Sequence, residues 1–485
     1  MTDSPLPASN RLRLLGLDFG STTSSMMLAE AEVGRHSLDG RMGFGEPHIL
    51  LQSTPVFTPF NGQTLDQDAL IALLDQWLLE ADWQNGNKTS VAGAALITGL
   101  AARSDNADII ARAVGERIGD SLIATADDPR LESWLAFMGS CATLSRARAA
   151  RPVINLDIGG GTTNPALGRH GQVSDCGCFY IGARHLRFAP GSYRLQHCSA
   201  TGYALLRQAA VAKMPGDELS PADISAITAL MVNALEAIVL GNAEFFCQSD
   251  FHRQLVQVAF APPLSASATS ETPLITFSGG VGELIYQHQQ GQPWPDRNHY
   301  GDLGIELAKA ICRSPILSAD LDTQPQHAGR ATVMGLTLHS CDVSGSSLYL
   351  SRPQLLPLRD LPILSRLPAS AGEQDWQRVL TLAAGCLQGA CISIEQDSNA
   401  DHHSVRTLAE RIRNALQQTA FPAQQPLVLL LDTNLGKTLG QYITAWGNDP
   451  RALFVIDEIP LRQARFVQLG RPHQHIVPVS FFGMH

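Results

Sequence analysis

The sequence lacks the clustered basic side chains that nucleic-acid-binding proteins need. Its 35 Lys and Arg residues are outnumbered by 45 Asp and Glu residues, and the formal net charge is −10. A phosphate backbone is bound through grouped Lys and Arg, because these side chains replace its counterions. We therefore exclude nucleic acid as a partner.

Long apolar runs are also missing. No run approaches the roughly 18 residues that a bilayer-spanning helix needs, and Met1–Asn10 is polar and lacks the apolar core of a signal peptide. The nine cysteines are an odd number and are most simply explained as free thiols in a reducing compartment. We expect a soluble, cytoplasmic protein without a membrane partner.

Glycine is plentiful, with 41 residues, and three glycine-rich turns stand out. In the clearest of them the apolar run Val153–Ile158, with Asp157 near its end, meets Gly159–Gly161 and then Thr162 and Thr163. Glycine allows a sharp turn whose N–H groups point at one object. A carboxylate beside such a turn suits a divalent cation. The pattern predicts a phosphate-binding hairpin, although an ordinary glycine-rich turn would look the same.

The design recurs along the chain. Leu14–Ser24 has an apolar run, Asp18, Gly20 and then small hydroxyl residues. Leu274–Glu283 combines a strand, a glycine turn and a helix start. Two Asp-x-Gly turns that face each other could hold a polyphosphate, and the third turn could accept a nucleoside against bare backbone.

The order of these turns resembles the superfamily of actin, heat-shock chaperone and sugar kinase ATPases. The resemblance implies an α/β, actin-like two-lobed ATPase made of duplicated ribonuclease H-like domains. It also implies two helices that connect the lobes near small residues, and Leu131–Gly139 and Arg330–Gly335 stand where these connectors are expected.

A narrower resemblance is to the family of ethanolamine ammonia-lyase reactivating factors, and it runs from about residue 13 to the end of the chain. Five stretches carry it: Asn155–Thr162, Ser278–Glu283, Arg330–Gly335, Ser344–Leu348 and Gln354–Pro362.

The resemblance implies the roles of particular residues. Asp18 and Asp157 would orient Mg²⁺ and so count as both catalytic and metal-binding residues. The turns around them would bind the phosphates of ATP through Gly20, Ser21, Thr22, Thr23, Gly159, Gly160, Gly161, Thr162 and Thr163. The adenosine would lie against Gly279, Gly280, Val281 and Gly282. Glu132 would orient the attacking water, but a glutamate favoured by the dipole at a helix start explains it equally well.

The 485 residues suggest two to four domains. We expect a tail at 1–10, a first ATPase lobe at 11–150, a second at 151–342 and an appended α/β region at 343–485. Similar openings of the two lobes suggest an internal duplication.

Apolar periodicity predicts the elements of these regions. Helices are expected at Leu70–Leu79, Ile109–Ile118, Pro221–Leu240, Phe251–Val258 and Ile305–Cys312. Strands are expected at Met26–Ala29, Val91–Thr98, Ile123–Ala126, Leu427–Leu431 and Ala452–Ile456, with a hairpin at Gly171–Gly182 and a loop at Pro262–Pro273.

Four weaker motifs are interpreted as structural. Gly436-Lys437-Thr438 resembles a P-loop, but Leu431 stands where that motif needs glycine. Neither Cys176 and Cys178 nor His402 and His403 have partners at zinc-type spacing. The loop that begins at Asp401 lacks the pattern of a corrin site.

Taken together, these features predict an ATP-dependent reactivating chaperone for ethanolamine ammonia-lyase. It would bind ATP or ADP with Mg²⁺, and it would meet cobalamin only through the lyase, from which it releases damaged cofactor. Three alternatives stay open: a small-molecule kinase, a reactivase of another cobalamin enzyme, and a scaffold that does not hydrolyse ATP. A homodimer and an association with the ethanolamine-utilisation microcompartment are also left open.

Overall fold

The structure, a computed structural model, describes residues 11–484 with gaps at 36–40, 62–63, 84–90, 99–100, 102–103, 119–121, 125–127, 190, 261–271, 297, 346, 396–401, 461 and 473–474. The expected tail at 1–10, most of the loop at 262–273, the end of the strand expected at 123–126, and Asp401 lie outside the described residues.

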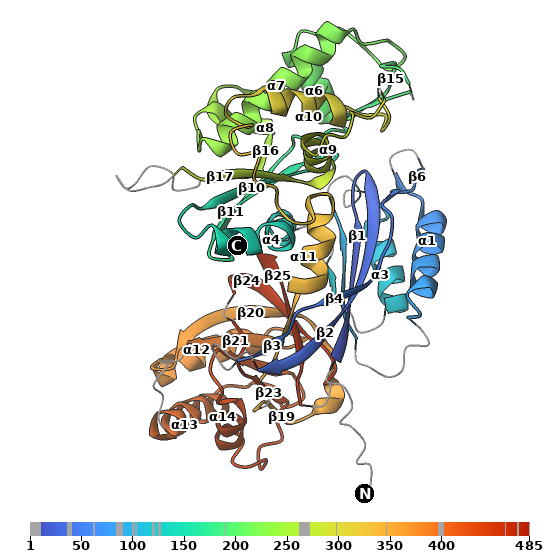
Figure 1. Ribbon diagram of the computed structural model, residues 1–485. Coiled ribbons are helices and arrows are strands. Elements are labelled where there is room, and N and C mark those ends of the chain that lie inside the picture. Colours follow the sequence, from blue (N-terminus) through green and yellow to red (C-terminus); the bar gives the residue numbers. More distant parts are fainter. Residues whose placement is uncertain are drawn as a thin grey trace, which may run out of the picture.

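The first sheet grows from an antiparallel hairpin near the N-terminus (Figure 1). Its strand order is β3-β2-β1-β8-β9, and β8 and β9 run parallel to β1. The strands are β1 (Arg11–Phe19), β2 (Thr23–Arg35), β3 (Met42–Phe44), β4 (His48–Gln52), β5 (Val56–Phe57), β8 (Val91–Ile97) and β9 (Leu122–Ala124), with a separate ribbon of β6 (Phe60–Asn61) and β7 (Thr64–Leu65). Helices α1 (Gln67–Glu80) and α3 (Ala107–Ile118) bury their apolar faces against this sheet, as their periodicity predicted.

The second sheet repeats that plan. Its order is β16-β13-β11-β10-β17, again with a hairpin (β10–β11) and a parallel neighbour (β17). Its strands are β10 (Val153–Ile158), β11 (Thr163–Arg169), β12 (Gln172–Cys176), β13 (Cys178–Phe179), β16 (Val256–Val258) and β17 (Leu274–Ser278). The shared order of hairpin and parallel strand confirms the duplication expected from the sequence.

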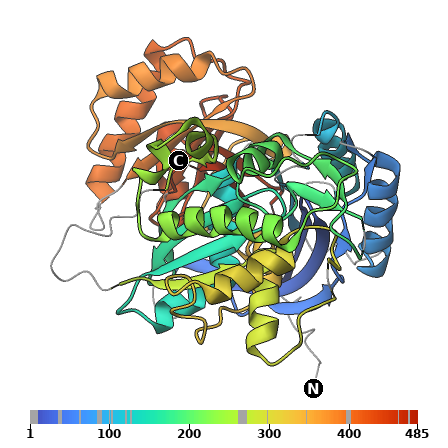
Figure 2. The same cartoon turned by 90° about the horizontal axis from the view of Figure 1, so that it is seen from above.

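Helices and a small ribbon cover the second sheet (Figures 1 and 2). They are β14 (Leu186–Phe188), β15 (Leu195–Cys198), α6 (Ala200–Gln208), α7 (Pro221–Val239), η1 (Phe245–Cys247), α8 (Asp250–Gln254), α9 (Gly279–Gln289) and α10 (Gly304–Arg313). Among the described residues one helix, α7, is long and apolar enough to cross a membrane. Its apolar residues, such as Ile227, Met231 and Leu235, belong to the core of this lobe, which accounts for their hydropathy.

Two predictions for this lobe were wrong. The helix expected at Phe251–Val258 stops at Gln254, and Val256–Val258 forms strand β16, because pairing with β13 at the sheet edge overrides helical propensity. Gly171–Gly182 is not a hairpin of its own, since β12 and β13 both pair with β11 as its return strands.

Two helices cross between the sheets. Helix α4 (Pro129–Ser140) leads through α5 (Ala142–Ala147) to the second sheet, and α11 (Ala331–His339) follows the short turn η2 (Ala328–Arg330). They touch backbone to backbone, because a Cβ on Gly139 would lie 2.0 Å from the Ala331 carbonyl oxygen and one on Gly335 equally close to the Leu135 carbonyl oxygen. The expected connectors with small residues are confirmed.

The C-terminal residues form a third sheet of order β18-β25-β24-β20-β21-β22-β23-β19. Its elements are β18 (Cys341–Val343), β19 (Tyr349–Leu350), η3 (Pro353–Leu355), β20 (Leu358–Pro368), α12 (Glu373–Ala384), β21 (Ala390–Glu395), α13 (His402–Gln418), β22 (Leu427–Leu431), α14 (Gly436–Ile443), β23 (Leu453–Ile456), β24 (Ala464–Leu469) and β25 (Pro478–Met484). The strands expected at 427–431 and 452–456 are confirmed, and Gly436-Lys437-Thr438 starts a helix after a strand, as interpreted.

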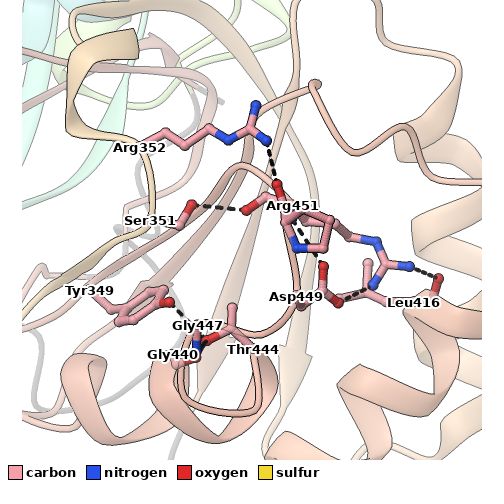
Figure 3. A network of polar contacts seen from close by, with 10 residues as sticks. Tyr349, Ser351, Arg352, Leu416, Gly440, Thr444, Gly447, Asp449 and Arg451 are labelled. Carbon is pink, nitrogen blue, oxygen red and sulfur yellow. Dashed lines mark hydrogen bonds and ion pairs between the residues drawn. The ribbon is translucent and has the colours of Figure 1, made fainter.

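A polar network fixes one end of the third sheet to its helices (Figure 3). The Arg451 guanidinium lies 2.6 Å from Asp449 and donates to the Leu416 carbonyl oxygen at 3.0 Å. The Tyr349 hydroxyl lies 2.8 Å from the Thr444 hydroxyl. These contacts order the connections that follow α13 and α14.

Candidate functional site

The two Asp-x-Gly hairpins face each other between the first and second sheets. Both turns close in the same way, with the Gly20 N–H donating to the Thr23 carbonyl at 3.0 Å and the Gly159 N–H donating to the Thr162 carbonyl at 2.9 Å. A Cβ on Gly160 would lie 2.1 Å from the Thr22 hydroxyl, so glycine permits this approach of the hairpins.

A cavity of about 390 Å³ lies between the hairpins. Most of the residues predicted from the sequence line it: Asp18, Gly20, Ser21, Thr22, Thr23, Glu132, Asp157, Gly159, Gly160, Thr162, Gly279, Gly280 and Val281. The three glycine-rich turns and the first connecting helix therefore meet at one place, although they span more than 250 residues of sequence.

Three predicted residues do not line this cavity. The Thr163 hydroxyl donates to the Ile181 carbonyl at 2.7 Å and is fully buried. Gly161 is buried in the turn, and Gly282 lies where a Cβ would be 2.8 Å from the Phe277 backbone. These residues shape the turns and the packing of α9 on β17. The structure does not support direct contact between them and a ligand.

The two aspartates have different surroundings. The Asp18 oxygen Oδ1 is buried without a hydrogen-bond partner among the described residues, whereas Asp157 Oδ1 accepts from the Ser278 hydroxyl at 2.6 Å. Burial, with the nearby Asp157 carboxylate, raises the pKa of Asp18 to about 7. Burial raises the pKa of Asp157 to about 6, and the bond from Ser278 opposes that shift.

Glu132 lies in the first turn of α4, whose N-cap Asp128 accepts from the Leu131 N–H, and it faces the cavity. Burial and then the charges of Asp157 and Asp18 raise its pKa well above the usual value, while bonds from Thr98 and Asn164 lower it. A glutamate placed only for the helix dipole would not need to line the same cavity as two aspartates. The structure thus places the three predicted carboxyl groups around one cavity.

These carboxyl groups fit a divalent cation. Asp18 offers a buried oxygen without a hydrogen-bond partner among the described residues, and burial raises the pKa of both aspartates, which a bound cation would oppose. The described residues contain no group of three or more His, Cys, Asp or Glu side chains that could hold a metal ion. Mg²⁺ suits such a site, because it keeps several waters and takes only one or two protein carboxylates together with phosphate oxygens.

Cys176 and Cys178 are buried thiols, as interpreted from the sequence.

Sequence reasoning missed several lining residues, among them Thr98, Glu283, Tyr300, Asp302 and Arg330. Thr98 directly follows β8, the parallel neighbour of β1, and a hydroxyl residue at that strand end was a usable signal. The others come from helix starts and loops that close the cavity only in three dimensions.

Asp302 is a further carboxylate that lines the cavity, and its position raises the question of whether it could act as a catalytic base. Burial raises its pKa to about 6, while the Gly304 N–H and Arg184 favour its charged form. Oδ1 accepts from the Gly304 N–H at 2.8 Å, and Oδ2 lies 3.8 Å from the Arg184 guanidinium. Both oxygens are therefore engaged within the second lobe.

The third turn opens toward the same cavity. Gly279 has a φ of +76°, and a Cβ there would lie 2.5 Å from the Ile158 carbonyl oxygen, so the turn depends on glycine. A Cβ on Gly280 would meet nothing within 4 Å, which leaves bare backbone facing the cavity.

Two hairpin-opened sheets, joined by crossing helices around one lined cleft, define the actin-like fold of two-lobed ATPases. The chain belongs to the family described as ethanolamine utilisation protein EutA, and the model of this family matches residues 10–482. It is 30% identical to ethanolamine ammonia-lyase reactivase EutA of Escherichia coli (strain K12), over 97% of this chain and 98% of that protein. The identity to the reactivase of the same name from Salmonella typhimurium is also 30%, with the same coverage.

Solved structures show more distant likeness. The Aquifex aeolicus PPX-GPPA enzyme is 14% identical with a TM-score of 0.36, covering 68% of this chain and 91% of that one. Ethanolamine utilization protein EutJ from Carboxydothermus hydrogenoformans is 15% identical with a TM-score of 0.31, covering 69% and 91%. The fold is defined by the sheet order of this chain, not by these likenesses.

Proposed function

We propose that this protein is an ethanolamine ammonia-lyase reactivase that uses ATP to release damaged cobalamin from the lyase, so that intact adenosylcobalamin can bind again. The observation that carries the proposal is the meeting of both hairpins, Glu132 and the third turn at one cavity, in a chain of the EutA family. Cobalamin needs no site of its own here, because it stays with the lyase until release.

The shape of the cavity supports ATP as its ligand. The hairpin N–H groups and hydroxyls, including those of Ser21, Thr22 and Thr162, would donate to the phosphates. The bare backbone at Gly279 and Gly280 would accept the adenosine. A nucleotide placed in this way contacts both lobes, so its binding favours the closed arrangement over an open one.

The charge of the cavity explains why the nucleotide would enter with Mg²⁺. Among the described lining residues only Arg330 is basic. Five lining residues carry carboxyl groups: Asp18, Glu132, Asp157, Glu283 and Asp302. A polyphosphate alone would be repelled by them. Mg²⁺ held by Asp18 and Asp157 would neutralise charge on the phosphate oxygens.

Hydrolysis would use Glu132 to orient water toward the terminal phosphate. Burial raises the pKa of Glu132, and the charges of Asp157 and Asp18 add to that shift. Thr98 and Asn164, which donate to it, would fix the direction of its carboxylate. This step is phosphoanhydride hydrolysis: water bonds to the terminal phosphorus, the bond from that phosphorus to the bridging oxygen breaks, and ADP and phosphate leave, with the proton of water passing to the products.

A kinase is the weaker candidate. A kinase of this fold needs a free carboxylate base near the terminal phosphate, and the oxygens of Asp302 are engaged by Gly304 and Arg184.

Self-association into a homodimer and association with the microcompartment stay predictions of the family resemblance.

The test measures phosphate release from MgATP by the purified protein, alone and with lyase inactivated by cyanocobalamin. Lyase activity is then followed in the same tube after adenosylcobalamin is added. We expect ATP-dependent recovery with the wild type and none with Asp157→Ala. Phosphate release without recovery would contradict the lyase as partner, and recovery that needs no nucleotide would contradict the role of ATP.

A further inference from the structure

Through one residue, Arg462, the C-terminal region contacts helix α4 and the strand that directly follows α11. This arginine lies in the connection between β23 and β24, and its guanidinium carbon is 4.8 Å from the centre of the Trp134 ring of α4. One of its guanidinium nitrogens lies 2.9 Å from Oδ1 and 2.8 Å from Oδ2 of Asp342, in β18 just after α11.

This contact is shielded from water. The side chains of Arg462 and Asp342 are only 18% and 19% exposed. The guanidinium also lies 5.7 Å from the ring centre of Phe481 in β25, which is buried. A shielded ion pair with aromatic contacts holds its geometry better than an exposed pair, because neither water nor salt competes strongly for it.

The position of Trp134 on α4 gives the contact its meaning. Trp134 stands two residues after Glu132, and residues two apart on an α-helix point to nearly opposite sides. Helix α4 therefore presents Glu132 to the cavity and Trp134 to the C-terminal sheet. A displacement of α4 at one face must be felt at the other, because the helix is rigid over this single turn.

A second contact lies four residues away in the same connection. Glu458 is 4% exposed, and its carboxylate accepts from the Arg35 guanidinium at 3.1 Å and from the Met42 N–H at 2.8 Å. The connection at 457–463 is thus tied to the first sheet through β2 and β3 and to the connectors through Arg462, as far as its residues are described.

We infer that Arg462 couples the nucleotide cavity to the C-terminal sheet by holding the far face of α4 and, through Asp342, the strand that follows α11. Arg462 is a positioning residue in this account, since it touches no ligand. Closure of the lobes on ATP shifts the two connectors, and Arg462 passes that shift to β24 and β25. The inference rests on the proposed function and names the internal route by which it acts on a partner.

The experiment compares full-length Arg462→Met with a matched control, Arg465→Met. Arg465 is an exposed arginine three residues further on, in β24, and it forms no ion pair with another described residue. For Arg462→Met we expect phosphate release from MgATP within about threefold of wild type. Recovery of cyanocobalamin-inactivated lyase should fall at least tenfold. Arg462→Lys, which keeps the charge without the planar group, should give intermediate recovery.

A purely structural role would lower ATP hydrolysis and lyase recovery together. The decisive result is therefore a loss of recovery without a matching loss of hydrolysis. Recovery at the wild-type level in Arg462→Met would overturn the inference, as would an equal loss in Arg465→Met.

Hydrogen exchange of the wild type provides the second measurement. MgATP should change the protection of β24 and β25, and Arg462→Met should lose that change. Unchanged protection in the wild type would overturn the inference, even where the variant fails to fold. If the wild type does not reactivate the lyase at all, the proposed function fails, while this exchange experiment still decides the coupling.

Discussion

The two Asp-x-Gly hairpins have the same turn but different neighbours. In the first sheet Asp18 pairs with Leu96 of the parallel strand β8, and in the second sheet Asp157 pairs with Ser278 of β17. Ser278 donates to Asp157, whereas Leu96 has nothing to donate. The pKa of Asp18 accordingly rises to about 7 and that of Asp157 to about 6. Burial is the main cause of both raised pKa values; the Asp157 charge adds to the rise for Asp18, and the Ser278 hydroxyl on the adjacent strand opposes it for Asp157.

The largest expected effect is that of Asp157→Asn. This change keeps the size of the side chain and the acceptor for Ser278 but removes the charge. We expect phosphate release to fall by about 10³-fold, because carboxylate and Mg²⁺ stabilise the transferring phosphate together. Steady-state phosphate release checks this. A loss of less than about tenfold would contradict the role of Asp157 in holding the ion.

Glu132→Gln should have the next largest effect. Loss of the carboxylate that orients water should lower kcat by about 10²-fold. ATP affinity should stay within about threefold, since the amide still fits beside Thr98 and Asn164. Single-turnover hydrolysis and calorimetry separate the two quantities. Unchanged hydrolysis would leave Glu132 as a residue of the helix start only.

Gly160→Ala tests whether the hairpins must approach closely. The added Cβ would lie 2.1 Å from the Thr22 hydroxyl, and forced overpacking of this kind costs about 1–3 kcal/mol. MgATP affinity should therefore fall roughly tenfold. Gly34→Ala is the control, because a Cβ there meets nothing within 4 Å. Equal affinities in the two variants would contradict a single site built by both hairpins.

Ser278→Ala makes the second hairpin resemble the first and should have a smaller effect. The Ser278 hydroxyl favours the charged form of Asp157, so its removal raises the pKa of that carboxylate. The acid limb of kcat/KM against pH should shift upward by about one unit. Ser174→Ala, on an exposed position of β12, should leave the limb in place. A downward shift or none would show that Asp157 does not control that limb.

The sequence was most informative where backbone geometry demands glycine. Both hairpins and the third turn were predicted from glycine positions, because few other residues fit there, whereas the connecting helices α4 and α11 were predicted from the resemblance to the ATPase superfamily. Burial could not be predicted in the same way. Asp302 and Arg330 reach the cavity from loops and turns that carry no periodic signal.

Local propensity failed at sheet edges. Val256–Val258 was predicted as helix but forms strand β16, which pairs with β13. This pairing could not be predicted from local sequence, because β13 lies almost 80 residues away. Thr163 was assigned to phosphate because it follows the glycines, and yet its hydroxyl is turned inward to Ile181. In both cases the deciding contact is long-range or depends on side-chain direction, and neither can be read from spacing.

The most direct test of the central claim, one nucleotide site made by both hairpins, is calorimetric titration of MgATP. Wild type should bind one ATP per chain. Asp18→Asn and Asp157→Asn should each weaken binding, and the double variant should be little weaker than the worse single variant, because both act on the same bound ion. Two ATP molecules per chain, or fully additive losses, would contradict the account.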